Sequence, residues 1–470
     1  MMNTMKKRKW KKNTCRLLAT ALTMGFLLTG CGSENGTTTQ SSDTPNTVSS
    51  GTPTTENKNG TVKPDQLKLN AENLSANVKR VEIPETPMNS TNGNALSRSG
   101  FQMLQKTVEF GQDNNANYLI SPISLQIALG MTVSGSDKGT KTREEMMNLL
   151  LPGVTADPEV LNKEMASFTK RMKEAQQVSW NVANSIWVKN DGRAKLRESF
   201  VEDMTNYYQA ELFSAPFDQS TVNDINAWVN ANTRERIPKI INELKEDTLL
   251  ALVNAMAFDG EWKDQYEEKD ILKGQEFTNA DGTKSEVTLL SSEENSSIRL
   301  ADGLGFVKPY KGWQYAFVAL LPPEGMSTGD YLTKITKDQT AFAEAYLNRD
   351  YGQVLVEMPE FKAEFGTTMD EILTALGVEA AYSDRAEFRT MLTDDSEPVK
   401  IGTVIHKAMI EVDRKGTKAA AATIVEMDSE SAMEMPHEPL YIRLDRPFVY
   451  AIVDTETGVP VFLGAENTIK

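Results

Sequence analysis

The side chains that most often perform catalysis are scarce in this sequence. Its only histidines are His406 and His437, so a zinc site with three histidine ligands cannot form, and a Ser-His-Asp triad would need one of these two. The two cysteines, Cys15 and Cys31, both lie near the N-terminus, so the rest of the chain has no thiol for catalysis, metal binding or a disulfide. A hydrolase with His406 as general base is disfavoured because no Gly-x-Ser-x-Gly turn occurs. We therefore expect no enzyme, metal site or cofactor.

One stretch, Gly416 to Pro436, has an unusual pattern. Four alanines follow Gly-Thr-Lys, and the β-branched run Thr423-Ile424-Val425 comes directly after them. Alanine favours helix, whereas β-branched residues favour strand. Read with the two-residue period of a strand, one face is small or apolar and the other is largely polar. The stretch fits a short helix, an edge strand, or a segment that is a loop in one state and a strand in another.

The composition describes an acidic chain that is large enough for a substantial core. It has 470 residues, 39% of them hydrophobic, and a net charge of −16. Such a length suits one large domain or two. The negative charge argues against nucleic-acid binding, because contacts with phosphates need a basic face. The acidity is typical of a soluble surface.

The N-terminus has the features of a targeting segment. Six basic residues between Lys6 and Lys12 precede a short apolar run, Leu17 to Leu28, and the run ends in Leu28-Thr29-Gly30-Cys31. This sequence resembles a bacterial lipoprotein signal, in which the cysteine is lipidated and becomes the first residue. We expect residues 1–30 to be the signal peptide. Cys31 would then anchor the protein to a membrane, at the cell surface or outside the cell.

The residues after Cys31 lack the apolar side chains that a core requires. They are rich in Ser, Thr, Asn and Gly, which is typical of a flexible tether. About thirty residues of this kind have a root-mean-square reach of roughly 30 Å. We assign residues 31–80 to the lipidated cysteine and tether, and residues 81–470 to the folded domain.

The folded domain shows helical patterns early and strand patterns late. Ala95 to Phe110 has apolar residues at helical spacing, and Leu125 to Met131 is also helical. Tyr315 to Leu321 and Tyr441 to Val453 alternate as strands do. This order predicts an α+β fold rather than the alternating βαβ units of a parallel fold.

Several spaced motifs of the domain resemble those of the serpin family. The resemblance covers roughly residues 90 to 470. Its blocks are Ser-Pro-Ile-Ser (121–124), the Gly- and Thr-containing segment 134–146, Val-Ala-Asn-Ser-Ile-Trp-Val (182–188), the helix-like 225–237, Leu-Val-Asn-Ala-Met-Ala-Phe-Asp-Gly-Glu-Trp (252–262), Pro-Glu-Phe-Lys (359–362), Leu-Gly-Val (376–378), Asp-Arg-Pro-Phe (445–448) and Phe-Leu-Gly (462–464). The resemblance implies the serpin fold, with helices packed on three β-sheets and an exposed reactive-centre loop.

It also implies a function, that of a suicide-substrate inhibitor. In serpins a target protease cleaves the loop and forms an acyl-enzyme, and the loop then inserts into the main sheet and traps the protease. The expected partner is a protease of the serine class, or of the cysteine class, and the protein is expected to be a monomer. The alternative is a non-inhibitory lipoprotein with the serpin fold that binds another partner.

The same resemblance assigns roles to the unusual stretch. Its hinge would comprise Gly416, Thr417, Lys418, Ala419, Ala420, Ala421 and Ala422, with Thr417, Ala419 and Ala421 facing inward. Small side chains there allow the loop to pass between two strands. A spacing of fourteen residues from Gly416 puts the reactive bond at Glu430-Ser431. That glutamate would suit a Glu-specific protease. The loop is longer than in well-known serpins, so the bond could instead follow Met427, Met433 or Met435. A methionine there would suit chymotrypsin-, elastase- or subtilisin-like proteases. A bond after Asp428 is a further alternative.

Two further groups are implied by the resemblance. Ser121, Ser124, Asn254 and His406 would form a polar cluster that gates the opening of the main sheet, and Gly260 and Trp262 would lie where the loop enters it. The chain departs from the family at Arg414 and Lys415, because serpins usually carry acidic residues just before the hinge. A hinge salt bridge of the relatives is therefore expected to be absent or reversed. His437 is expected to be exposed on the loop.

Overall fold

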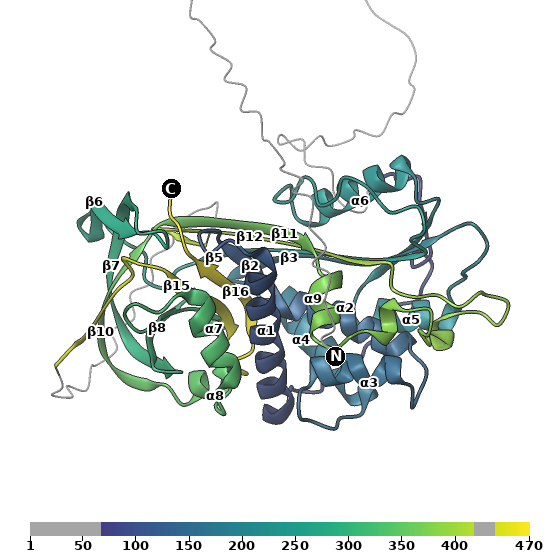
Figure 1. Ribbon diagram of the computed structural model, residues 1–470, viewed down its shortest axis with the longest axis horizontal. Coiled ribbons are helices and arrows are strands. Elements are labelled where there is room, and N and C mark those ends of the chain that lie inside the picture. Colours follow the sequence, from purple (N-terminus) through teal and green to yellow (C-terminus); the bar gives the residue numbers. More distant parts are fainter. Residues whose placement is uncertain (1–66, 418–437) are drawn as a thin grey trace, which may run out of the picture. The chain divides into compact units, whose positions relative to one another are not determined.

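The computed structural model describes residues 67–417 and 438–470, which contain both helices and strands (Figure 1). The predicted signal peptide, Cys31, Lys418 to Ala422, His437 and every candidate for the reactive bond lie outside these ranges. The helices of the described part are α1 (Ser90–Gly111), α2 (Pro122–Gly135), α3 (Lys141–Leu150), α4 (Pro158–Glu174), α5 (Glu198–Tyr207), α6 (Gln219–Asn232), α7 (Thr328–Lys337), α8 (Phe342–Leu347) and α9 (Asp370–Ala375).

Capping side chains explain where many of these helices begin. The side chains of Asn89, Ser121, Thr140 and Asp157 each accept a hydrogen bond from a backbone N–H in the first turn of the helix that follows. The N–H groups of a helix's first turn have no carbonyl partner within the helix, so each capping side chain supplies the missing acceptor. The prediction of a helix at Ala95–Phe110 is confirmed, and α1 is longer than predicted because it begins after the cap at Asn89.

The strands of the described part form two hydrogen-bonded sheets. The seven-stranded sheet has the order β1 (Glu72–Asn73), β4 (Glu211–Ala215), β3 (Val178–Lys189), β5 (Leu250–Glu261), β13 (Gly416–Thr417), β12 (Thr403–Asp413) and β11 (Phe361–Thr368). The nine-stranded sheet has the order β14 (Leu440–Arg443), β10 (Asp350–Pro359), β7 (Lys284–Leu300), β8 (Gly303–Pro309), β9 (Tyr315–Leu321), β15 (Phe448–Asp454), β16 (Pro460–Glu466) and β2 (Tyr118–Ile120), with β6 (Ile271–Thr278) paired to β7.

The sheet count differs from the three sheets that the resemblance implied. The difference comes from β7, which is 17 residues long and pairs with β6 and β10 over most of its length but with β8 at its C-terminal end. One strand thus joins two sheets that would otherwise be separate. The α+β fold itself is confirmed.

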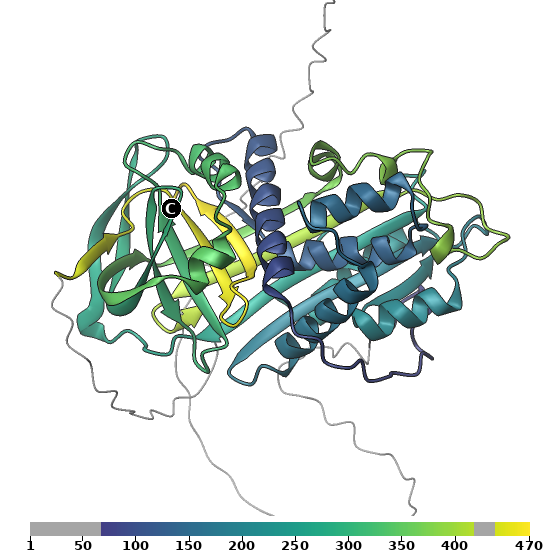
Figure 2. The ribbon, with the colours of Figure 1, turned by 90° about the horizontal axis from the view of Figure 1, so that it is seen from below.

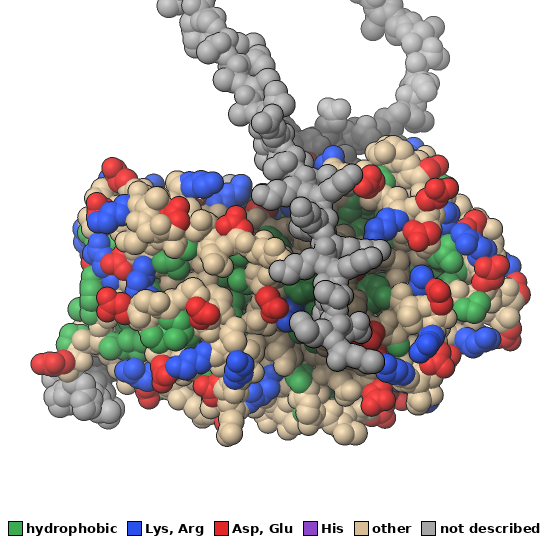
Figure 3. Space-filling view, in the orientation of Figure 1, with side chains coloured by type: hydrophobic (Ala, Val, Ile, Leu, Met, Phe, Trp, Pro, Cys, Tyr) green, Lys and Arg blue, Asp and Glu red, His purple; other side chains and the backbone are tan. Residues whose placement is uncertain are grey.

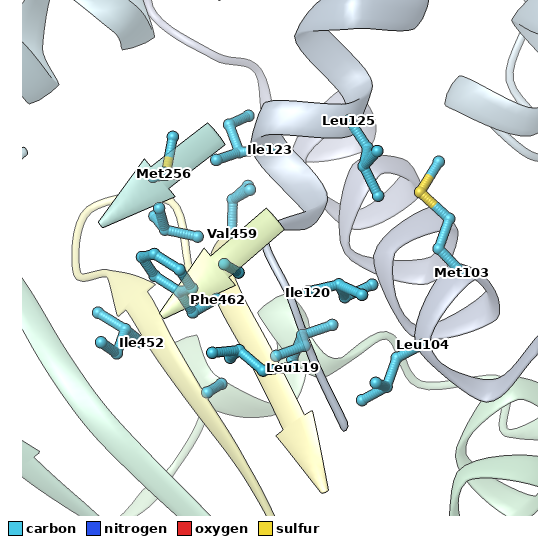
Figure 4. Close-up of a cluster of buried hydrophobic side chains, with 14 of the residues drawn as sticks. Met103, Leu104, Leu119, Ile120, Ile123, Leu125, Met256, Ile452, Val459 and Phe462 are labelled. Atoms are coloured by element: carbon cyan, nitrogen blue, oxygen red, sulfur yellow. The ribbon is translucent and has the colours of Figure 1, made fainter. Parts of the chain in front are cut away.

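Helices cover both faces of the seven-stranded sheet. Helix α6 lies on one face, whereas α2 and its neighbours lie on the other (Figures 1 and 2). Nearly every side chain of α2 is buried, so it is a helix of the core rather than of the surface. Its first turn contributes Ile123 and Leu125 to a dense apolar cluster with Ile120 of β2 and Phe462 of β16 (Figure 4). This packing fixes the backbone of Ser121 beneath the sheet.

Two predictions of boundaries are corrected. The strand-like run Tyr441–Val453 is two strands, β14 and β15, because Leu444 to Pro447 separates them and a proline cannot donate to a ladder. Residues 67–80, predicted to belong to the tether, include β1, which pairs with β4. Within the described ranges, no helix combines the length and hydropathy needed to cross a membrane.

Candidate functional site

The centre of the seven-stranded sheet contains a seam between β5 and β12. These two strands pair directly and in parallel, Ala251–Ala257 against Thr403–Met409. Beyond this segment they separate, and β13 lies between them. Gly416 pairs with Asp413 of β12 and Glu261 of β5. Thr417 pairs with Val412 of β12 and Gly260 of β5. Both ladders are antiparallel. The first two residues of the predicted hinge therefore already lie inside the sheet, while the rest of the seam is closed.

A row of polar side chains crosses this seam at its closed part. Asn254 of β5 lies directly opposite His406 of β12, and Asn184 of β3 lies opposite Asn254 on the other side. The Nδ1 atom of His406 is 3.1 Å from Oδ1 of Asn254, and the amide nitrogen of Asn254 donates to Oδ1 of Asn184. All three residues are buried. The row links three neighbouring strands through side chains as well as through the backbone.

The N-terminus of α2 forms hydrogen bonds to this row of polar side chains. The backbone N–H of Ser121 donates to Nε2 of His406 at 3.1 Å, and the hydroxyl of Ser124 donates to Oδ1 of Asn254. The Asn254 amide also donates to the carbonyl oxygen of Ser124 at 2.9 Å. The four residues of the predicted gating cluster are thus brought together. Asn184, a fifth member, was missed, although it lies in the 182–188 block and only the strand register reveals its place.

These contacts fix the protonation state of the histidine. Nε2 accepts from a backbone N–H, so it carries no proton, and Nδ1 donates to Asn254. Burial lowers the pKa of His406 to about 3, since no charged group compensates for its loss of water. The imidazole is therefore neutral at physiological pH. A neutral imidazole whose two nitrogens both have hydrogen-bond partners is suited to holding β5, β12 and α2 together rather than to acid–base catalysis.

Aromatic side chains form the wall at which the hinge enters the sheet. The indole ring of Trp262 stacks on Tyr310, with 4.6 Å between the ring centroids and 14° between the planes. Its Nε1 donates to the carbonyl oxygen of Asp413 at 2.8 Å. The hydroxyl of Tyr310 lies 2.6 Å from Oγ1 of Thr417, which is fully buried. Trp262 is thus both core packing and a direct support of the hinge.

Two glycines lie where the hinge meets β5, and neither has space for a side chain. An added Cβ on Gly416 would overlap the carbonyl oxygen of Gly260, and an added Cβ on Gly260 would lie 2.6 Å from the ring of Phe258. A side chain at Gly416 would require the backbone to move, and one at Gly260 would require the buried ring of Phe258 to move. The geometry therefore explains why both predicted positions, Gly260 and Gly416, are glycine.

Comparison with known proteins agrees with this arrangement. The family model described as "Serpin (serine protease inhibitor)" matches residues 94–468, which is most of the chain. The chain belongs to the serpin family. Most serpins act as inhibitors of proteases and are not enzymes, although some members serve other roles.

Relatives of this serpin occur in distant organisms. It is 28% identical to serpin-Z2A of Triticum aestivum over 382 residues, which are 78% of this chain and 94% of the relative. It is also 28% identical to alpha-1-antitrypsin 1-4 of Mus musculus over 360 residues, 75% of this chain and 83% of the relative. Among solved structures, the native state of the thermophilic serpin tengpin matches with a TM-score of 0.75 and 33% identity, covering 85% of this chain and all of tengpin.

The basic hinge of this serpin lies against acidic residues. The guanidinium of Arg414 is 3.4 Å from a carboxylate oxygen of Glu268, and both side chains are exposed. The backbone N–H of Arg414 donates to Oε1 of Glu360 at 3.3 Å. The basic residue Arg414, just before the hinge, therefore has an acidic neighbour in Glu268. An exposed pair of this length contributes little to stability.

A buried ion pair behind the aromatic wall was not foreseen from the sequence. Nζ of Lys308 lies 2.8 Å from Oε1 of Glu294, and both side chains are almost fully buried. The ammonium group also lies over the rings of Tyr266 and Trp262, 4.5 Å and 5.5 Å from their centroids. Burial alone would lower the pKa of Lys308, but Tyr266 and Glu294 outweigh it, and the pKa is raised. Only the tertiary structure brings these residues of β7 and β8 together.

We expect Lys308→Met to destabilise the protein by about 3–5 kcal/mol, because Glu294 would be left buried without its cation. Replacing both partners, as Lys308→Met with Glu294→Leu, is expected to restore stability, since the buried charges disappear together. The midpoint of urea denaturation checks both. The matched control is Lys273→Met, which breaks the exposed Lys273–Glu268 pair and should cost at most about 1 kcal/mol. Equal effects of the two lysine substitutions would contradict the prediction.

Proposed function

We propose that this serpin is a membrane-tethered suicide-substrate inhibitor of a protease. A target protease cleaves the loop after Thr417, and the resulting acyl-enzyme is trapped because the N-terminal part of the loop inserts between β5 and β12. We further propose that residues 1–30 are a bacterial lipoprotein signal and that Cys31 carries the lipid. The inhibitor would then act at the cell surface.

The observation that carries the proposal is the antiparallel position of β13 in the open end of the seam. Strands β5 and β12 are parallel to each other, whereas β13 runs antiparallel to both. An inserted strand that continued β13 would replace one parallel ladder with two antiparallel ladders. Antiparallel pairing is slightly more stable per residue, and the number of backbone hydrogen bonds increases. Insertion is therefore favourable once cleavage frees the loop.

The register of β13 supports a specific fit. If both ladders of β13 are extended by six residues beyond Thr417, the ladder with β12 reaches His406 and the ladder with β5 reaches Asn254. These two residues are paired with each other. A loop that inserted in this register would place Thr423 between them. The threonine hydroxyl can donate and accept, so it could replace the direct contact of His406 with Asn254. The alanines at positions 419 and 421 would face the buried side of the sheet, where small side chains meet least resistance.

The length of the seam also fits. Strand β12 has 11 residues and β5 has 12, so the slot is about 36–40 Å long at roughly 3.3 Å per residue. A loop cleaved at Glu430-Ser431 would supply fourteen residues after Gly416. That is enough to fill the slot from end to end. A bond after Met427 would supply eleven, about the number that the slot holds, and bonds after Met433 or Met435 would supply seventeen or nineteen, so every candidate bond gives a segment long enough to fill it.

The proposed target is a serine protease, with a Glu-specific enzyme favoured by Glu430 and a chymotrypsin-, elastase- or subtilisin-like enzyme favoured by the methionines. The rival function is binding without inhibition. Thyroxine-binding globulin, solved in complex with thyroxine, has a similar fold, with a TM-score of 0.67, but at 21% identity it bears on the fold alone.

Incubation with proteases of these four specificities tests the proposal. We expect one of them to form a complex that survives boiling in SDS, and mass spectrometry of the released C-terminal fragment to identify the bond. The cleaved protein should also resist heat better than the intact protein, because the inserted strand completes the sheet. Cleavage by every protease without complex formation, and without a gain in heat stability, would favour the binding function.

A further inference from the structure

The ion pair of Lys308 and Glu294 lies where proteins rarely place charges. Figure 3 shows Lys, Arg, Asp and Glu side chains spread over the surface of the molecule, whereas the side chains of this pair are only 2% and 6% exposed. Apolar residues of similar size often give the same stability as a buried ion pair, because both charges lose their water on folding. The pair is therefore better explained by its effect on its neighbours than by the stability that it adds.

Those neighbours are two aromatic rings. Nζ of Lys308 lies 4.5 Å from the ring centroid of Tyr266 and 5.5 Å from that of Trp262. A cation within about 6 Å of a ring centroid is attracted to the ring, more strongly when both groups are away from water. Glu294 reaches Tyr266 through Ser292, whose hydroxyl donates to Oε1 of Glu294 at 2.8 Å and lies 3.4 Å from the hydroxyl of Tyr266. The two charges together restrict the orientation of both rings.

The same two aromatic residues bind the turn between β12 and β13. The indole Nε1 of Trp262 donates to the carbonyl oxygen of Asp413 at 2.8 Å, and the backbone N–H of Trp262 donates to that of Lys415 at 2.9 Å. The backbone N–H of Tyr266 donates to the carbonyl oxygen of Arg414 at 3.2 Å. Three consecutive carbonyl groups are thus held by two residues. Because the turn reverses the chain from β12 into β13, it sets the register of β13 against both of its neighbours.

We propose that Lys308 and Glu294 are positioning residues for the insertion of the loop. They hold the rings of Trp262 and Tyr266 in the orientation that binds the turn, and the turn directs the cleaved loop into the antiparallel register of β13. Both charges act through the two aromatic residues. The inference rests on the proposed inhibitory function. It gives strands β7 and β8 of the nine-stranded sheet a part in an event that takes place in the seven-stranded sheet.

The test uses Lys308→Met with Glu294→Leu, the double variant that is expected to keep the stability of the wild type. The measurement is the number of inhibitor molecules cleaved for each protease molecule trapped. We expect this ratio to rise about fivefold, because insertion is slowed relative to hydrolysis when the rings lose the cation. The rate constant for cleavage should not change, since the loop is unaltered. The matched control is Lys284→Met with Glu276→Leu, which removes an exposed ion pair between β7 and β6 and should leave the ratio unchanged.

A double-mutant cycle with Trp262→Phe distinguishes positioning from a general effect on packing. Phenylalanine has no N–H to donate to Asp413, so removal of the ion pair should raise the ratio much less in this background than in the wild type. If the double variant folds poorly, Ser292→Ala gives the same test with a smaller change, because it removes the link between Glu294 and the hydroxyl of Tyr266. We expect that variant to raise the ratio at least about twofold.

An unchanged ratio in the double variant at wild-type stability would overturn the inference, as would an unchanged ratio in Ser292→Ala. Equal effects of removing the pair in the wild-type and Trp262→Phe backgrounds would also overturn it, because the pair would then not act through that ring. The proposed function fails in a different way. In that case the wild type itself would form no SDS-resistant complex with any of the proteases.

Discussion

We expect Thr417→Arg to turn the protein from an inhibitor into a substrate of its target protease. Thr417 is fully buried between β5 and β12, and its hydroxyl meets that of Tyr310. A guanidinium at this position would replace the hydroxyl that meets Tyr310, and burying an unpaired charge costs several kcal/mol. Such a charge would keep this residue out of the sheet before cleavage, so insertion would then have to bury it, and the barrier to insertion rises. Because 1.4 kcal/mol is a factor of ten in rate, hydrolysis should then overtake trapping by at least about tenfold.

The measurement is the stoichiometry of inhibition, with gel analysis of the products. The variant should be cleaved at the same bond as the wild type and should release active protease. Thr417→Ser keeps the small size and the hydroxyl, so it should inhibit as the wild type does. Arg414→Ala changes an exposed residue three positions earlier and controls for a general effect of altering the hinge. Trapping by Thr417→Arg at the wild-type stoichiometry would show that the loop does not enter at β13.

The sequence was enough to predict the fold class and four of the five members of the central cluster. Ser121 and Ser124 follow a recognisable pattern before a helix, and Asn254 and His406 each lie in a block with strand character. Their role came from resemblance, whereas the contacts came from the structure. The register that sets Asn254 opposite His406 depends on a pairing of strands that are about 150 residues apart, which no local pattern encodes.

Other parts of the site could not be predicted because their signals are not local. Lys308 and Glu294 look like exposed charges of alternating strands, but the two pair with each other and the rings of Tyr266 and Trp262 lie against Lys308. Tyr310 was missed for the same reason, since it precedes a turn and its contact with Thr417 spans 107 residues. The break between β14 and β15 has a local signal, because Pro447 lies directly before β15.

The second large effect expected is a loss of stability in acid that depends on His406. Its pKa is lowered to about 3 by burial, whereas an unfolded histidine titrates near 6.5. Below pH 6.5 His406 binds a proton in the unfolded chain but not in the native state. Its contribution to the free energy of unfolding is therefore complete above pH 6.5 and is lost as the pH falls toward 3. Each pH unit is worth about 1.4 kcal/mol, which gives a loss of about 2 kcal/mol at pH 5.

The variant His406→Gln isolates this contribution, because glutamine does not titrate and can still donate and accept a hydrogen bond. Other buried groups act in the opposite sense. Burial raises the pKa of Glu466 well above its usual value, so its contribution falls as the pH rises. The informative quantity is therefore the difference between wild type and variant in the free energy of unfolding, measured by urea denaturation from pH 7 to pH 4.

That difference also bears on the mechanism. Protonation of Nε2 would remove the acceptor that binds the N–H of Ser121, and the polar row would then lose its link to α2. The sheet should therefore open more easily in acid, and the wild type should incorporate a synthetic peptide of residues 416–429 faster at pH 5 than at pH 7. His406→Gln should show the same rate at both values. If wild type and variant respond to pH alike, His406 packs in the sheet without controlling its opening.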